Sequence, residues 1–244
     1  MEYQFGAGTL YGKSLTNTPA TPIRFGALQD VSIDFQFTTK ELFGSYQFPL
    51  AIGRGTGKIS GKANFAQFNA QAFNDLFFGL SNPSTGELQT AVAEAKTVTA
   101  NTVTVTHNTT FVRDLGIVYA TTGLPLSRVT SGPLTGNYSC NESTGVYTFN
   151  SGDNNAAVNV SYNWTDAANG KQISISNQLL GNAPQFLGVF TNTFQGKQMT
   201  LVLNACMSSK LTLATKLEDF TIPAFDFQAF ADSANNVGVL SLDE

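Results

Sequence analysis

Charged and catalytic side chains are scarce in this sequence of 244 residues. Asp, Glu, Lys and Arg make up 12% of the chain, about half the share of roughly 25% that is typical of soluble domains. There is one histidine, His107, and there are two distant cysteines, Cys140 and Cys206, which we expect to be buried free thiols rather than a bridge. Zinc-ligand spacings and the Gly-x-Ser-x-Gly nucleophile motif are missing. We therefore expect no catalytic, metal or cofactor site and predict that the protein is not an enzyme.

Long apolar runs and strong positive charge are missing as well. No apolar segment approaches the roughly 20 residues of a membrane span. The net charge is −4, which is unlike the basic footprint of a protein that binds nucleic acid tightly. Met1–Gly6 has neither a basic stretch nor an apolar segment, so we expect no signal peptide. These absences favour a protein made in the cytoplasm that does not cross a membrane.

Phenylalanine and uncharged polar residues are abundant instead. The chain has 20 Phe against 7 Tyr and 1 Trp, and Thr, Asn, Ser and Gln supply much of the polar surface. Phe can fill the core of a β-sandwich or cover a subunit interface, and both alternatives stay open here. A surface with few charges is poorly protected against self-association. The composition therefore hints at a protein that assembles.

Alternating apolar and polar residues indicate two long strands. In the first, the apolar residues are Val31, Ile33, Phe35 and Phe37, and the polar residues between them are Ser32, Asp34, Gln36 and Thr38. The second strand runs from Gly57 to Phe65. A period of two is typical of strands that bury one face. The connection at residues 39–56 is too long for a tight turn, so it either extends both strands beyond the body or forms a loop with a task of its own.

One helix and several shorter strands complete the predicted fold. Apolar residues recur at helical spacing between Asn69, a suitable N-cap, and Gly79, a suitable stop. Further strands are predicted at Phe111–Ala120, Tyr138–Cys140, Val146–Phe149, Ala157–Trp164, Gln172–Gln178, Gln185–Gln195, Lys197–Ala205 and from Phe225 onward. Residues 1–22 are rich in Gly, Thr and Pro and are predicted to be an extended arm. We predict a mainly β fold, an antiparallel β-sandwich or barrel flanked by one α-helix.

A glycine-rich segment, Gly53–Lys58, superficially resembles a phosphate-binding loop. Its spacing fails, because three residues rather than four separate Gly53 from Gly57, and Ile59 follows the lysine in place of Ser or Thr. The segment also enters a predicted strand, so no helix N-terminus would face a phosphate. The glycines instead indicate a strand that bends or lies close to another backbone.

The remaining titratable groups are interpreted as solvated. His107 stands alone in a polar turn between strands. The acidic pair Glu218 and Asp219, and Asp226 near Asp232, lie at strand ends and turns. None of these groups has the partners that acid–base or metal chemistry requires.

Several long stretches of the chain resemble one known family. They are Phe37–Leu50, Arg54–Ala63, Phe68–Gly79, Thr215–Asp232 and Gly238–Ser241. In these stretches the chain resembles the major tail tube protein of long-tailed bacteriophages. The likeness covers most of the chain and is strongest in residues 25–80 and 197–242. It implies a tail-tube β-sandwich domain at 23–244, with a β-rich insertion at about 95–185, and an N-terminal arm at 1–22 that bridges rings.

The resemblance implies a structural protein of the virion tail that is assembled in the cytoplasm of a bacterial host. Family members self-assemble into hexameric rings whose sheets line a continuous inner β-barrel, and the rings stack into a tube. The implied partners are further copies of the chain, a tape measure protein, and tail terminator and tip proteins. Double-stranded DNA passes through such a tube during genome ejection without being held.

A long hairpin loop reaches the neighbouring ring in this family. The matching segment of this chain carries Lys40, Glu41, Tyr46, Phe48 and Arg54. The resemblance therefore makes these five residues the candidate contacts between rings.

A lumen for DNA should be acidic or neutral, because each Lys or Arg that binds a phosphate adds affinity. Asp34 lies on the polar face of its predicted strand, and Lys58 and Lys62 lie on the polar face of the next. All three are candidate lumen residues, although the lysines could instead pair with acids of the adjacent subunit.

Two other functions stay open at this point. One is the tube protein of a contractile injection or secretion system, which typically lacks so long an insertion. The other is a non-catalytic β-sandwich binding module, for example for carbohydrate. The single Trp and the few Tyr argue against a surface that stacks on sugars.

Overall fold

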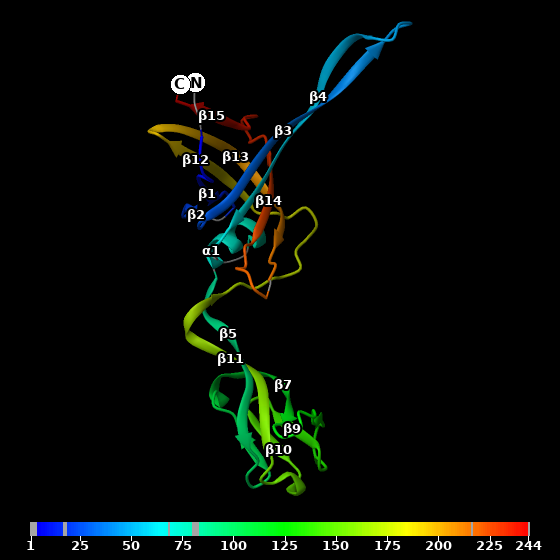
Figure 1. The fold of residues 1–244 in the computed structure, drawn as a ribbon, viewed down its shortest axis with the longest axis vertical. Coiled ribbons are helices and arrows are strands. Elements are labelled where there is room, and N and C mark those ends of the chain that lie inside the picture. Colours follow the sequence, from blue (N-terminus) through cyan, green and yellow to red (C-terminus); the bar gives the residue numbers. More distant parts are fainter. Residues whose placement is uncertain (1–3, 17–18, 68, 80–82, 216, 244) are drawn as a thin grey trace. The chain divides into compact units, whose positions relative to one another are not determined.

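The computed structural model describes residues 4–16, 19–67, 69–79, 83–215 and 217–243. The chain divides into two compact units (Figure 1). Unit 1 combines Met1–Pro83 with Ile173–Glu244, and unit 2 is Ser84–Gln172. Each unit has a hydrophobic core of its own.

Unit 1 is built on one antiparallel sheet. Its strands are β1 (Thr9–Ser14), β2 (Ile23–Arg24), β3 (Leu28–Phe43), β4 (Pro49–Phe65), β12 (Gln185–Phe194), β13 (Lys197–Thr212), β14 (Ala224–Phe230) and β15 (Gly238–Leu242). Their order is β2-β1-β12-β13-β14-β4-β3, and β15 pairs with the first part of β13. The strands of this sheet pair antiparallel. The predicted mainly β, antiparallel fold is confirmed.

Phenylalanine rings fill the core of unit 1. Phe225 is fully buried, and its ring centroid lies 5.1 Å from that of Phe77 and 5.3 Å from those of Phe25 and Phe227. The ring of Phe186 lies 5.9 Å away. For these five residues, core packing is the role that the structure selects. Aromatic contacts of this kind contribute about 0.5–1.5 kcal/mol each beyond the burial of area.

The one α-helix among the described residues packs on this core. α1 (Ala70–Phe73) continues into a π-helical turn, η1 (Asn74–Phe78). The side-chain oxygen of Asn69 accepts hydrogen bonds from two backbone N–H groups of the first turn, at 2.9 and 3.2 Å. Gly79 ends the turn with φ of 59°, a conformation that glycine adopts at little cost. The predicted helix and both of its caps are confirmed. No helix in the described part of the chain has the length and apolar character to cross a membrane.

Unit 2 consists of two small sheets that share a core. One sheet has the order β5-β11-β7, with β5 at Ser84–Thr97, β11 at Ala157–Gln172 and β7 at Phe111–Tyr119. The other has the order β6-β10-β9-β8, with β6 at Thr102–Thr104, β10 at Val146–Phe149, β9 at Asn137–Asn141 and β8 at Ser127–Arg128. Two 3₁₀ turns, η2 (Asn108–Thr110) and η3 (Ser151–Asp153), complete the unit. Its buried core includes Val98, Ile117, Tyr138, Tyr147, Phe149, Val158, Val160 and Tyr162.

Three predictions made from sequence need correction. The extended arm at residues 1–22 is wrong for Thr9–Ser14, which forms β1 and pairs with β12 because its alternate residues pack on the core. The strand at Gln172–Gln178 ends at Gln172, since residues 173–178 have no partner strand in the described chain. The insertion was predicted at about residues 95–185, whereas unit 2 is Ser84–Gln172, so the predicted bounds are too late at both ends.

Strand β5 was not predicted from the sequence, because Ala and Glu, which recur in it, have low strand propensity.

Excision of unit 2 tests whether the two units fold separately. Ser84 and Gln172 are partners in an antiparallel ladder, and such partners have Cα atoms only about 5 Å apart. A short Gly-Ser linker from Pro83 to Ile173 should therefore close the chain, and we expect unit 1 to keep its far-UV circular dichroism spectrum and one cooperative unfolding transition. Loss of that transition would show that unit 1 needs the insertion to fold.

Candidate assembly surfaces

The hairpin of β3 and β4 extends beyond the rest of its sheet (Figure 1). The neighbouring strand β14 pairs with β4 only as far as Ile59. Beyond that level, β3 and β4 pair with each other alone, up to the pair Phe43 and Pro49. Gln36–Phe43 of β3 and the residues of β4 opposite it thus form a two-stranded ribbon. The ribbon is about 26 Å long at roughly 3.3 Å per residue. Of the two alternatives for the 39–56 connection, the structure selects the extension of both strands.

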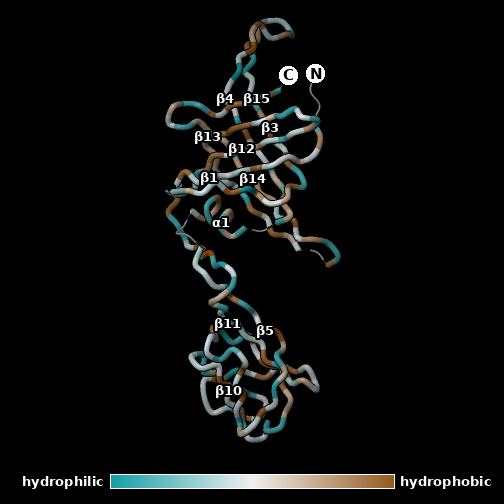
Figure 2. Tube along the Cα trace, turned by 90° about the vertical axis from the view of Figure 1, so that its left-hand side faces the viewer, coloured by the Kyte–Doolittle hydropathy of each residue, from teal (hydrophilic) through white to brown (hydrophobic). Residues whose placement is uncertain are grey.

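The end of this hairpin exposes large apolar side chains. They are Leu42, Phe43, Tyr46, Phe48, Leu50 and Ile52. Tyr46 and Phe48, in the turn at residues 44–48, are 82% and 80% exposed. Figure 2 shows brown, apolar positions in this part of the trace. Complete burial of a large apolar side chain is worth about 1.5–3 kcal/mol, so the hairpin tip has much to gain from a partner.

Contacts between the two strands stiffen the hairpin. The guanidinium carbon of Arg54 lies 3.2 Å from the ring centroid of Phe37, a cation–π contact worth about 0.5–1 kcal/mol at an exposed site. The hydroxyl groups of Thr38 and Thr56 lie 3.1 Å apart and share a hydrogen bond. A Cβ atom at Gly57 would approach the Phe37 ring to 2.8 Å. The glycine-rich segment therefore permits close approach across the hairpin, in agreement with the strand interpretation.

The structure gathers the five candidate inter-ring residues on this hairpin. Lys40 and Glu41 belong to β3, Tyr46 and Phe48 to the turn, and Arg54 to β4. All five are exposed. Their shared place on one projecting element is a geometry in which all of them can contact the same partner.

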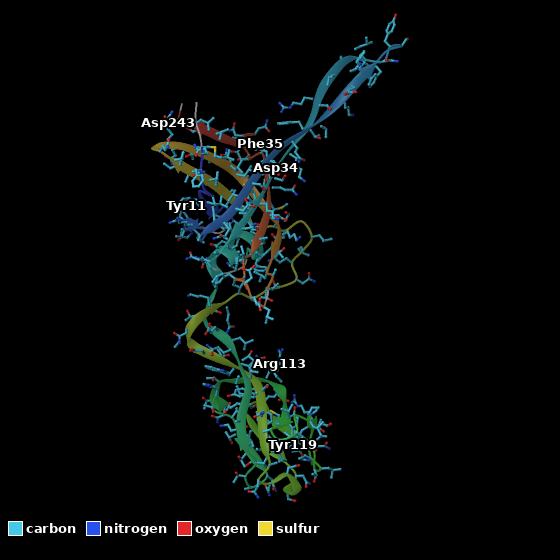
Figure 3. The ribbon with its side chains drawn as sticks, viewed as in Figure 1. Tyr11, Asp34, Phe35, Arg113, Tyr119 and Asp243 are labelled. Atoms are coloured by element: carbon cyan, nitrogen blue, oxygen red, sulfur yellow. The ribbon has the colours of Figure 1, made fainter. Side chains whose placement is uncertain are left out.

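The three candidate lumen residues lie on one face of the sheet. In the pairing of β3 with β4, Asp34 is opposite Ser60, and the next pair on the same face is Gln36 and Lys58. Lys62 is opposite Ser32 of β3 on one side and Asp226 of β14 on the other. Side chains alternate between faces along a strand. Asp34 and its neighbour Phe35, both labelled in Figure 3, therefore belong to opposite faces of β3.

This polar face extends across four strands and is electrically balanced. Its acids are Asp30, Asp34 and Asp226, and its bases are Lys58, Lys62 and Lys210. Sequence reasoning missed Lys210 because only the strand order shows that it lies opposite Asp226 on the same face. With equal numbers of both signs, the face offers a phosphate backbone little net attraction.

Two edges of this four-stranded part are unpaired within the described residues. Strand β3 pairs only with β4, so one side of its backbone faces away from the sheet. At the other end of the group, β12 pairs with β13 no further than Met207, which leaves the β12 side of β13 open as far as Thr212. Open edges present unsatisfied N–H and C=O groups that readily accept another strand.

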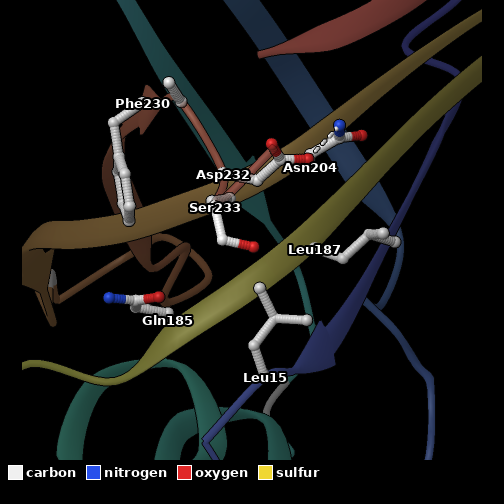
Figure 4. Close-up of a pocket in the computed structure, with 9 residues that line it drawn as sticks. Leu15, Gln185, Leu187, Asn204, Phe230, Asp232 and Ser233 are labelled. Atoms are coloured by element: carbon white, nitrogen blue, oxygen red, sulfur yellow. Dashed lines mark hydrogen bonds between the residues drawn. The ribbon is translucent and has the colours of Figure 1, made fainter. Parts of the chain in front are cut away.

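Unit 1 also contains a hollow of about 620 Å³ (Figure 4). Its one carboxylate, Asp232, accepts hydrogen bonds from the Asn204 side-chain nitrogen at 2.8 Å and from the backbone N–H groups of Ala234 and Asn236 at 2.9 Å. These bonds lower the pKa of Asp232, the backbone bond from Asn236 most of all. The Asp232 carboxylate therefore stabilises a turn. The described residues that line the hollow include no general base that could act together with Asp232.

Three carboxylates of unit 2, Glu94, Asp114 and Asp153, accept hydrogen bonds from tyrosine hydroxyl groups. Asp114 accepts hydrogen bonds from Tyr138 at 2.7 Å and from Tyr147 at 3.1 Å, and Arg128 lies 3.5 Å away. Burial and the nearby Asp114 charge raise the pKa of Cys140 to about 11, so this thiol is a poor nucleophile. Both cysteines are free, as expected, but only Cys206 is buried, whereas Cys140 is half-buried. Burial raises the pKa of Cys206 to about 12.

His107 differs from the prediction. Its ring stacks on Trp164 with centroids 3.6 Å apart and an interplanar angle of 3°. It is half-buried rather than a solvated loop residue. The stack also covers the one Trp of the chain on that side, which removes a surface that a sugar could use.

No protein-family model matches the chain, and no curated protein shows significant sequence similarity to it. In the described residues, no group of three or more His, Cys, Asp or Glu side chains is arranged to hold a metal ion. The surfaces that distinguish the molecule are the apolar hairpin, the balanced polar face and the open sheet edges.

Glu94 provides a prediction on pH dependence. Burial opposes its ionisation, but hydrogen bonds from Lys96, Thr106 and Tyr162 outweigh burial and lower its pKa from 4.5 to about 2. A lowered folded-state pKa contributes stability above about pH 4.5 that is lost as the pH falls towards 2. The denaturant midpoint of unit 2, followed by Trp164 fluorescence, should therefore decrease between pH 5 and pH 2.5.

The variant Glu94→Gln should lower the midpoint at pH 5 and flatten its dependence on pH. Glu218→Gln changes an exposed carboxylate of unit 1 and serves as the control. An equally steep acid dependence in Glu94→Gln would contradict the assignment to Glu94.

Proposed function

We propose that this protein is the repeating subunit of a bacteriophage tail tube, in which copies close into hexameric rings and the rings stack into a conduit for DNA. The observation that carries the proposal is the β3–β4 hairpin, which projects from the sheet and exposes its large apolar side chains to water. Exposed apolar surface of this kind marks a site of contact with another chain. The resemblance of the sequence to tail tube proteins supplies the identity of that chain, a further copy of the same protein.

The open edges support closure into a ring. Strands β3, β4, β14 and β13 alternate in direction, so β3 and β13 run antiparallel to each other. In a ring, β3 of one copy meets β13 of the next, and an even number of strands per copy makes this junction antiparallel too. A heterologous contact that closes on itself pairs these two edges in every copy.

Charge on the polar face fits the same junction. Across the sheet, Lys62, Asp226 and Lys210 follow one another with alternating sign. The next strand in a ring is β3 of the neighbouring copy, which carries Asp30 and Asp34 on this face. Opposite charges on adjacent strands contribute roughly 0.2–1 kcal/mol per pair. The alternation would thus continue from one copy to the next.

The polar face is the proposed lumen surface. Its balanced charge suits a passage that DNA crosses without being held. During assembly the same passage would enclose a tape measure protein, and terminator and tip proteins would close the ends of the tube in the virion tail. Neither of these partners needs a catalytic group from the subunit.

Shortening of the hairpin tests this proposal. Replacement of residues 40–55 by an Asn-Gly turn should leave the far-UV circular dichroism spectrum of the core unchanged, because the deleted residues lie beyond the strand pairs of the main sheet. Negative-stain microscopy should show tubes for the full chain and none for the shortened chain.

The substitution Leu134→Ser, at an exposed position of unit 2, is the matched control and should leave tube growth unchanged. A full chain that forms neither rings nor tubes at any concentration would overturn the proposal. An unfolded shortened chain would show that the hairpin is part of the core.

A further inference from the structure

We infer that the connection between β13 and β14 is the surface that receives the hairpin tip of a second copy. This inference rests on the proposed function and names the partner surface that the hairpin needs. The receiving segment is residues 217–222, here called the basal loop. Its occupant is the hairpin tip, residues 42–52, of a copy in the adjacent ring.

The hairpin tip and the basal loop lie at opposite ends of the same strands. At the end of the sheet away from the tip, Asp30, Asn64, Ala224 and Thr212 follow one another in register across β3, β4, β14 and β13. The basal loop joins β13 to β14 just beyond this level. In Figure 1, the hairpin leaves the body of unit 1 at one end and the start of β14 lies towards the other. A shift along the strand direction therefore brings the tip of one copy to the basal loop of the next.

Both surfaces expose large apolar side chains. Leu217 is 99% exposed and Phe220 is 88% exposed. Leu213, at the end of β13, is also exposed, and Ile222 is partly so. Tyr46 and Phe48 at the tip are exposed to a similar extent. Apolar groups of this size on a surface loop mark a contact with another molecule.

The charges of the two surfaces are complementary. The basal loop carries two acids, Glu218 and Asp219, and Lys216 directly precedes it in the sequence, so the whole connection of residues 213–223 is acidic by one net charge. The tip itself, residues 42–52, is uncharged, and the hairpin directly behind it carries two bases, Lys40 and Arg54, against the single acid Glu41. Contact between a basic and an acidic surface steers association and excludes contact between two tips or between two basal loops.

The contact is heterologous, because the tip and the basal loop are different surfaces of one chain. A heterologous contact that does not close repeats without limit along one direction. Each added ring presents a fresh set of tips at one end and a fresh set of basal loops at the other. The inference thus accounts for open-ended growth along one axis.

Two variants separate the two surfaces. The tip variant is Tyr46→Ser with Phe48→Ser, and the basal variant is Leu217→Ser with Phe220→Ser. Each should form single rings that do not stack. When preformed rings of the two variants are mixed in equal amounts, the tips of the basal variant should dock on the basal loops of the tip variant. Negative-stain microscopy and sedimentation velocity should then show stacks of two rings and no longer ones.

The control is Leu134→Ser, which should stack like the unmodified chain. Unimpaired stacking of the basal variant, together with failure of the tip variant to stack, would overturn this inference and leave the proposed function standing. Absence of rings and tubes from the unmodified chain would instead overturn the proposed function.

If the basal variant is poorly folded, reversal of single charges provides an independent test of the contact between the hairpin and the basal loop. Lys40→Glu and Glu218→Lys should each reduce the fraction of stacked rings, and a chain that carries both changes should recover it. No recovery in the doubly changed chain would contradict the pairing of these two surfaces.

Discussion

Backbone hydrogen bonding at the edge of a sheet is the constraint on which the rest of this structure depends. A strand that pairs on one side leaves a row of N–H and C=O groups without protein partners on the other. In the described part of this protein, strand β3 has no partner on its outer side, and β13 has none on its β12 side after Met207. These two open edges lie at opposite sides of the four-stranded group β13-β14-β4-β3. Proteins that remain single protect such edges with charges, bulges or covering loops. In the proposed ring, these two edges of neighbouring copies would pair with each other.

The surfaces of unit 1 differ in character from one element to the next. Phe225 and its neighbours fill the inner face of the sheet. The outer face of β3, β4, β14 and β13 is polar and balanced in charge. The ends of the strands carry apolar residues, on the hairpin at one end and on the basal loop at the other. In the proposed tube, lateral and axial contacts would therefore use separate residues.

Sequence patterns predicted the parts of the fold that local chemistry controls. The alternation through Val31–Phe37 predicted β3, and Asn69 and Gly79 predicted both ends of the helix. Strand β5 and the pairing of β1 with β12 were not predicted, because their strand character depends on partners distant in sequence. The hairpin could be located from sequence, but the shared face of Lys62, Asp226 and Lys210 could not, since it depends on the strand order. Glu218 and Asp219 of the basal loop are exposed, as predicted, whereas the exposure of their neighbours Leu217 and Phe220 could not be read from the sequence.

Hydrogen–deuterium exchange of the β3 amides tests the central claim most directly. In a separate copy, the outward-facing N–H groups of Leu28–Phe37 have no partner strand and should exchange rapidly, whereas those that bond to β4 should be protected. Under assembly conditions, with a sedimenting mass of six 26.0 kDa chains or a multiple of that, the outward-facing groups should become protected as well. Equal exchange of these amides in dilute and concentrated protein would contradict the account, because it would show that no strand ever joins this edge.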